Sequence, residues 1–194
     1  EKIMRILLIV ILCLPLFCRA EAATAWDIQQ LMQGLAQVKE AKGKFVEHKF
    51  LSVLNRPLES SGTLFFQSPD HLEKHTLTPK AETLVLDRGV LTIESKTRNI
   101  KRTLVLQEYP AIWAFVESIR STLAGDLPTL QRFYQVELEG DAAHWQMRLQ
   151  PVELKMRDVI SEIRVSGRHN RVDSIETVEA NGDHALMKVM EESP

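Results

Sequence analysis

The sequence predicts an α+β fold in which one curved antiparallel sheet of about 10–11 strands holds helices against its concave face. Two segments repeat their apolar residues at helical spacing, and many short β-prone runs follow each of them. Two helices are too few to cover both faces of so large a sheet. A sheet that curves around them, as an incomplete barrel, is therefore the most economical arrangement.

The first helix is expected from Trp26 to Ala41, because apolar residues recur there with a spacing of three and four. These residues are Ile28, Leu31, Met32, Leu35 and Val38. Thr24 and Asp27, three positions apart, resemble a capping box at the start of the helix. Gly43 stands where such a helix should end.

The segment after Gly43 changes to the two-residue period of strands. The runs are Phe45–Phe50, Thr63–Phe66, Thr83–Leu86, Val90–Ile93 and Thr103–Leu106. Asn55-Arg56-Pro57 is a turn signal, and Asp87-Arg88-Gly89 predicts a hairpin between the third and fourth runs.

A second helix is expected from Tyr109 to Leu123, since Pro110 suits a first turn and Gly125 suits the residue after the end. Glu117, Ser118, Arg120 and Ser121 form one side. The other side is apolar, with Ile112, Trp113, Phe115, Val116, Ile119 and Leu123. This apolar share is high for a surface helix, so the helix is expected to cover another part of the molecule.

The rest of the chain returns to β-prone runs with turn signals between them. The runs are Phe133–Leu138, Trp145–Leu149, Val159–Val165, Arg171–Val178 and Leu186–Met190. Sequential strands with short turns favour one antiparallel meander.

The N-terminal segment has the features of a secretory signal peptide. Met4 and Arg5 precede an apolar stretch, Ile6–Phe17, that is shorter than the roughly 20 residues of a membrane-spanning helix. Cys18 follows, but lipidation there requires a small preceding residue and Phe17 is bulky. Cleavage is instead expected after Ala22 or Ala25. Residues 1–22 are then the signal and 23–194 one domain.

Composition excludes several classes of protein. Cleavage removes both cysteines, so the mature chain has no disulfide and no thiolate metal ligand. The net charge of the whole chain is −2, which gives no electrostatic case for binding nucleic acid.

Signals for catalysis are weak, and the chain is predicted not to be an enzyme and to need no cofactor. The motifs Gly-x-Ser-x-Gly, His-Glu-x-x-His and the Gly-rich phosphate loop do not occur. His71 and His75 lie in a strand-like segment, where four residues span about 13 Å, too far for one metal ion. Glu47 and Glu94 are expected to be solvated strand residues rather than a catalytic pair.

The apolar residues of the first strands allow two interpretations. They form either a packed core beneath the helices or the wall of a cavity for an apolar ligand, and spacing alone favours the core. The residues concerned are Leu64, Phe66, Leu84, Leu86, Leu104 and Leu106.

A series of motifs runs from about Trp26 to Val189. An amphipathic helix leads to Gly-Lys-Phe-Val-Glu at 43–47, and Gly62-Thr63-Leu64-Phe65-Phe66 follows with Pro69 and Leu72. The Asp87-Arg88-Gly89 hairpin, the apolar mid-chain helix and the 145–151 segment Trp-Gln-Met-Arg-Leu-Gln-Pro come next. In this order the motifs resemble those of the periplasmic outer-membrane lipoprotein carriers, the LolA family.

The resemblance implies an incomplete barrel whose helices act as a lid over an apolar cavity. It implies a soluble, monomeric periplasmic carrier that takes acyl chains of lipoprotein or other lipid cargo from an inner-membrane donor protein to an outer-membrane acceptor protein. The lipid-binding residues would be Leu64, Phe66, Leu72, Leu84, Leu86, Leu104, Leu106, Ile112, Phe115, Val116 and Ile119. The alternative is a lipid-sensing regulatory domain of the same fold.

Two positions differ from the family pattern. The family's lipoprotein carriers have an arginine that holds the lid where this chain has Ser68, and a phenylalanine where it has Leu72. The latch would then be either missing or built differently, from Arg98 or Arg120. The cargo stays open between lipoproteins and other acylated molecules such as glycolipids.

We predict that the exported protein begins at Ala23 or Trp26, because Phe17 makes Cys18 a poor lipidation site. Intact-mass measurement and N-terminal sequencing of the protein from a periplasmic extract test this. An N-terminal acylated Cys18 would contradict the prediction and indicate an anchored protein.

Overall fold

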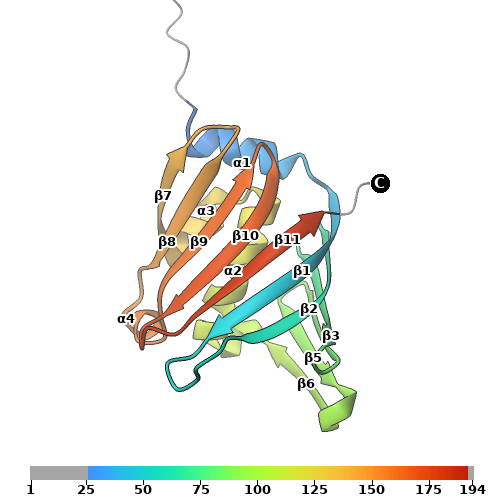
Figure 1. Ribbon diagram of the computed structural model, residues 1–194. Helices are drawn as coiled ribbons and strands as arrows, with labels where there is room; N and C mark the ends of the chain where they lie inside the picture. The colour runs from blue at the N-terminus through green and yellow to red at the C-terminus, as the bar shows by residue number, and fades with distance from the viewer. Residues whose placement is uncertain (1–25, 192–194) are drawn as a thin grey trace, which may run out of the picture.

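The structure, a computed structural model, describes residues 26–191, so the expected signal peptide lies outside the described residues. It contains one antiparallel sheet of 11 strands (Figure 1). The first half of the sheet comprises β1 (Glu40–Phe50), β2 (Leu58–Gln67), β3 (His71–Thr78), β4 (Glu82–Asp87), β5 (Val90–Ser95) and β6 (Ile100–Val105). The second half comprises β7 (Tyr134–Gly140), β8 (Trp145–Pro151), β9 (Ile160–Arg168), β10 (Arg171–Glu179) and β11 (His184–Glu191).

The strand order is β6-β5-β4-β3-β2-β1-β11-β10-β9-β8-β7. The first strand therefore pairs with the last, from Gly43 opposite Glu191 to Phe50 opposite His184. The expectation of a single meander is wrong: two meanders are joined through β1 and β11, and β6 and β7 end the order at opposite edges. The predicted α+β class, with a large, curved and unclosed antiparallel sheet, is confirmed.

Within residues 26–191, four α-helices accompany the sheet: α1 (Ile28–Ala36), α2 (Pro110–Ala124), α3 (Leu127–Phe133) and α4 (Leu154–Arg157). Short 3₁₀ turns, η1 (Lys96–Arg98) and η2 (Leu106–Glu108), flank β6. The sequence patterns missed α3 and α4. Asp126, whose side chain accepts a hydrogen bond from the amide of Thr129, caps α3 and starts a new helix directly after Gly125 ends α2.

The first helix is shorter than expected. Asp27 and Gln30 form a capping box, in which the carboxylate of Asp27 accepts from the Gln30 amide at 2.9 Å. The helix ends at Ala36 rather than Ala41, because β1 already begins at Glu40. Gly43, expected as a stop signal, lies within β1 opposite Leu64.

The hairpin and the second helix follow their local signals. Arg88 and Gly89 both have positive φ angles, as the tight turn between β4 and β5 requires. Helix α2 begins at Pro110 and ends before Gly125, whose left-handed conformation terminates it.

Two apolar clusters pack the helices against the sheet. The larger one joins α1, α3 and part of α2 to the second half of the sheet. Its fourteen buried residues are Leu31, Met32, Leu35, Ala114, Leu127, Leu130, Tyr134, Trp145, Met147, Leu149, Met156, Ile160, Ile163 and Val165. The smaller one has only three buried residues, Leu86, Leu91 and Leu106, with Trp113 and Val116 of α2 packed against them.

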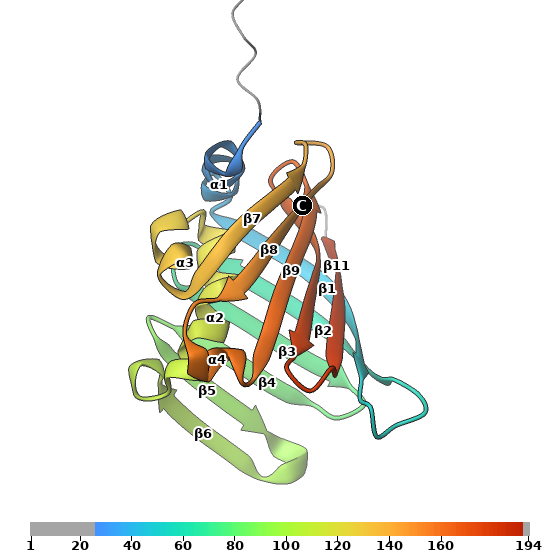
Figure 2. The same ribbon diagram turned by 90° about the vertical axis from the view of Figure 1, so that its left-hand side faces the viewer.

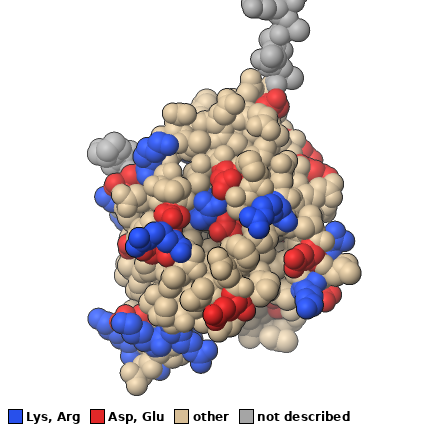
Figure 3. Space-filling view, turned by 180° about the vertical axis from the view of Figure 1, so that it is seen from behind, with Lys and Arg blue, Asp and Glu red and all other residues tan. Residues whose placement is uncertain are grey.

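The two halves of the sheet curve around the helices, with α2 within the curve (Figure 2). The view from the helix side shows acidic and basic side chains interspersed over much of the surface (Figure 3). Lys and Arg gather at its lower left, where the β5–β6 hairpin ends with the sequence Lys-Thr-Arg-Asn-Ile-Lys-Arg at 96–102. The near-zero net charge is thus unevenly distributed.

Gly125 is predicted to be the more sensitive of two left-handed glycines to substitution by alanine. A Cβ there would lie 2.2 Å from the Met32 carbonyl oxygen of α1, in addition to the backbone strain at φ +67°. Gly89 has a similar φ of +79° with open space around it. Gly89→Ala should lower the free energy of unfolding by about 1–2 kcal/mol, and Gly125→Ala by a further ~1–3 kcal/mol from overpacking.

Urea unfolding of both variants measures this difference. Equal losses of unfolding free energy in the two variants would show that α1 does not pack as closely against Gly125 as the structure indicates.

Candidate functional site

A cavity of about 440 Å³ lies between the concave face of the sheet and α2. The apolar side chains of α2 that border it are Ile112, Phe115, Val116, Ile119 and Leu123. Strands β1 to β5, β10 and β11 supply most of the opposite wall, and Leu35 and Val38 border the cavity beside α1. Cavities of about 300–1,000 Å³ with mainly apolar walls are typical of sites that bury one small organic ligand.

Strand alternation decides which side chains point into the cavity. Phe66 lies opposite Leu72 of β3, and Leu72 packs against the buried Leu86 below α2, so Phe66 is on the inner face. Phe65 is next to it in β2 and also borders the cavity, but strand alternation turns its ring to the outer side of the sheet. Its ring packs with the outer side chains of Lys42, at 5.4 Å, and His71, at 5.9 Å between ring centroids.

Helix α2 turns its apolar side toward the cavity and buries its polar side. Ser118 and Ser121 are fully buried and Glu117 is 8% exposed, whereas Ile112 at one end of the apolar side is 37% exposed. The buried hydroxyls are satisfied locally: Ser118 donates to the Phe115 carbonyl at 2.6 Å. The apolar side of α2 thus packs on the sheet only in part, and its remaining apolar surface borders the cavity.

Nine of the eleven residues predicted to bind lipid border this cavity. They are Leu64, Phe66, Leu72, Leu84, Leu86, Ile112, Phe115, Val116 and Ile119. Leu104 and Leu106 do not border it: Leu106 is one of the three buried residues of the small cluster, and Leu104 packs against that cluster. Leu106 starts the 3₁₀ turn η2 rather than continuing strand β6, which removes it from the strand face.

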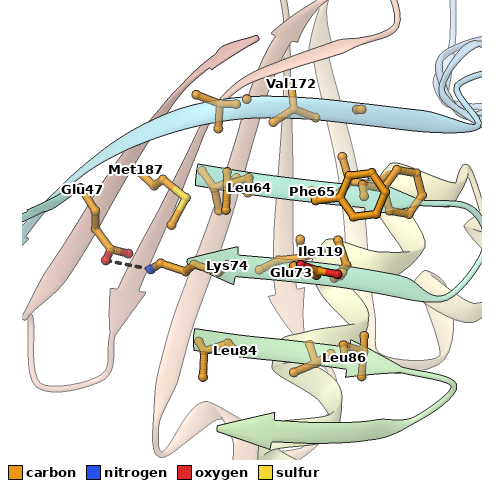
Figure 4. Close-up of a pocket in the computed structure, with 18 of the residues that line it drawn as sticks. Glu47, Leu64, Phe65, Glu73, Lys74, Leu84, Leu86, Ile119, Val172 and Met187 are labelled. Atoms are coloured by element: carbon orange, nitrogen blue, oxygen red, sulfur yellow. Dashed lines mark hydrogen bonds and ion pairs between the residues drawn. The ribbon is translucent and has the colours of Figure 1, made fainter. Parts of the chain in front are cut away.

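The sequence patterns missed a charged pair inside the cavity. Glu47 of β1 and Lys74 of β3 point toward one another, with 2.9 Å between the carboxylate Oε2 and the ammonium Nζ (Figure 4). Both border the cavity. Glu47 is therefore not the solvated strand residue that was expected, and Glu94 lies away from it in β5, opposite Lys101. The two residues are 27 positions apart in the chain, so no local pattern could show the pair.

His71 and His75 lie on the outer face of β3, on either side of Glu73. The Glu73 carboxylate contacts His71 Nε2 at 2.8 Å and His75 Nε2 at 2.5 Å. The hydrogen bond to Glu73 raises the pKa of His71, and the hydrogen bonds to the two imidazoles lower the pKa of Glu73. Within residues 26–191, no group of three or more His, Cys, Asp or Glu side chains could hold a metal ion.

Helix α2 is tied to the β2–β3 turn by Arg120. Its guanidinium donates to the Pro69 carbonyl at 3.0 Å, to Glu117 at 2.7 Å and to Asp126 at 2.9 Å. Burial alone would lower the pKa of Arg120, but hydrogen bonds to Asp126 and Glu117 outweigh it and raise that pKa. Arg98, the other candidate latch, pairs instead with Glu82 at the far end of the β5–β6 hairpin.

A family model described as outer membrane lipoprotein carrier protein LolA-like matches residues 20–189. The match covers most of the chain, so the chain belongs to this family. The resemblance read from the order of motifs is thereby confirmed. A comparison with curated proteins found no match. No helix among residues 26–191 has the length and apolar composition needed to cross a membrane.

Solved structures include distant matches. A LolA superfamily protein from Nitrosomonas europaea is 7% identical, with 88% of this chain and 96% of that chain covered and a TM-score of 0.46. The MucA/MucB complex of Pseudomonas aeruginosa is 12% identical, with 84% of this chain and 55% of that chain covered and a TM-score of 0.48. An outer membrane lipoprotein-sorting protein domain from Vibrio parahaemolyticus is 7% identical, with 86% of this chain and 91% of that chain covered and a TM-score of 0.43. These scores are all below 0.5, so the family assignment rests on the sequence match.

Arg120→Lys is predicted to loosen α2 from the β2–β3 turn. Lysine keeps the charge but cannot present the planar fork that reaches Pro69, Glu117 and Asp126 at once. Amide hydrogen exchange in α2 and around Pro69 should become faster, and the free energy of unfolding should fall by about 1–3 kcal/mol. Arg98→Lys is the control: its half-exposed ion pair with Glu82 is worth at most about 1 kcal/mol. Equal effects in the two variants would contradict a latch at Arg120.

Proposed function

We propose that the chain is a soluble periplasmic carrier that shelters the acyl chain of a lipid or lipoprotein in the cavity for transfer to the outer membrane. The observation that carries the proposal is the orientation of α2. Its apolar side borders the cavity and its polar side is buried against protein. Family membership supports a carrier rather than a catalyst.

The hydrophobic effect makes such a shelter necessary. Transfer of a sixteen-carbon chain out of water is worth roughly 12 kcal/mol, at about 0.8 kcal/mol per CH₂. An uncovered acyl chain would therefore stay in its membrane. A cavity lined by aliphatic and aromatic side chains offsets that cost while the cargo crosses an aqueous compartment.

Loading and unloading require other proteins. We propose an inner-membrane donor and an outer-membrane acceptor as partners, with the carrier acting as a monomer between them. Mass spectrometry of lipids that co-purify with the protein from the periplasm identifies the cargo directly. If the wild type yields no more acylated molecules than the cavity variant Phe66→Glu, the result would count against the proposal.

Phe66→Glu and Phe65→Glu form the matched test of the cavity. The Phe66 ring is 3% exposed on the inner face but belongs to neither packed cluster, so a charge there should reach water through the cavity and leave the fold intact. Phe66→Glu should abolish binding of a fluorescent fatty acid, while Phe65→Glu, on the outer face, should bind within about threefold of the wild type.

Titration with the fluorescent fatty acid, with circular dichroism as the folding check, separates the outcomes. If Phe66→Glu unfolds the protein, the inner face is a filled core rather than a binding site. If both variants bind normally, the ligand does not occupy this cavity.

A further inference from the structure

We propose that Glu47 and Lys74 form the head-group site of the cavity and select cargo whose polar group beside the acyl chain is uncharged. Such a group both donates and accepts hydrogen bonds, as an amide or a hydroxyl-bearing ester does. The inference rests on the proposed carrier function and names the class of cargo that the same cavity takes.

The position of the pair fits a head group rather than a tail. Among the side chains of β1 to β5 that point into the cavity, Glu47 and Lys74 carry the charges, while Leu64, Leu84 and Met187 lie around them (Figure 4). The Glu47 side chain is 25% exposed and that of Lys74 is 23% exposed. Farther along the strands, Phe66 and Leu86 are both 3% exposed. An amphiphile would thus have its polar end at the pair and its tail toward α2 and α1.

The pair retains hydrogen-bonding capacity. Glu47 Oε2 accepts from Lys74 and, at 3.2 Å, from the Ser60 hydroxyl. Among the described residues no donor contacts Glu47 Oε1. An ammonium has three donor hydrogens, and Lys74 directs one to Glu47 and lies 4.8 Å from the centre of the Phe45 ring. One free acceptor and at least one free donor therefore lie side by side in an apolar wall.

The electrostatics of the pair distinguish between ligands. The two charges cancel, so a neutral group with a donor and an acceptor can bond to both without adding charge to the cavity. A fatty-acid carboxylate gains from Lys74 but is repelled by Glu47, and its own burial must be compensated. A group that only accepts, such as a methyl ester, leaves Glu47 Oε1 unsatisfied. The pair therefore favours neutral donor–acceptor head groups over both alternatives.

Competition for a cavity-bound apolar dye at pH 8 tests this with three palmitoyl probes: monopalmitoylglycerol, methyl palmitate and palmitate. The wild type should bind monopalmitoylglycerol about tenfold more tightly than palmitate. Glu47→Gln leaves the Lys74 charge uncompensated, so it should shift the affinity ratio at least tenfold toward palmitate. Lys74→Met leaves Glu47 unpaired and should weaken palmitate binding most.

Two further variants keep the test decisive. The double variant Glu47→Leu with Lys74→Met replaces the pair by apolar groups, which cores tolerate well. It should fold, bind all three probes and lose discrimination between monopalmitoylglycerol and methyl palmitate. Glu40→Gln is the control, because Glu40 makes its ion pair with Lys42 on the outer face of the same strand and should leave every ratio unchanged.

The outcomes separate the two proposals. If no palmitoyl probe displaces the dye from the wild type, the carrier function fails and this inference fails with it. If the probes bind but Glu47→Gln leaves the ratio within twofold of the wild type, or the wild type prefers palmitate, the head-group site is refuted while the carrier function stands. If the single variants do not fold, discrimination retained by the double variant refutes the site.

Discussion

The pairing of β1 with β11 is the constraint on which the rest of the structure depends. It joins the first and last strands along eight residue pairs and places the two meanders side by side. The stacked rings of Phe50 and His184, 4.5 Å apart, lie at one end of this seam. Because the seam is central, the edges β6 and β7 fall on opposite sides of the sheet, and the chain between them must return across the concave face. Helices α2 and α3 make that return, which places them inside the curve.

Features that depend on neighbouring residues could be predicted from the sequence. The Asp87-Arg88-Gly89 hairpin and the limits of α2 at Pro110 and Gly125 follow from local backbone preferences. The pairing of β1 with β11 could not be predicted, since the residue pattern within a strand does not indicate which other strand it pairs with. Helix α3 could not be predicted either, because seven residues are too few to show a helical period. Phe133 is also equally compatible with the start of a strand.

The candidate site was predictable where it follows strand alternation and not where it depends on pairing across strands. Leu64 and Phe66 share the inner face by the two-residue period alone. Glu47 and Lys74 meet only because β2 lies between β1 and β3 with a particular register. The polar side of α2 is a similar case. Glu117, Ser118 and Ser121 look like solvent-facing residues, but neighbouring side chains and carbonyls satisfy them when they are buried.

Helix α2 is held unequally by the two halves of the sheet. On the side of β7 to β9 it contributes to a cluster of fourteen buried residues, and the hydroxyl of Tyr134 donates to the Ala114 carbonyl. On the side of β2 to β5 it meets a cluster of three buried residues and the Arg120 bond to Pro69. Each buried apolar side chain is worth about 1.5–3 kcal/mol, so separation costs far less on the second side. That side is also where Leu64, Leu84 and the Glu47–Lys74 pair line the cavity. Helix α2 is thus attached more weakly to the half of the sheet that supplies most of the cavity wall, and moving it away from that half leaves the larger core intact.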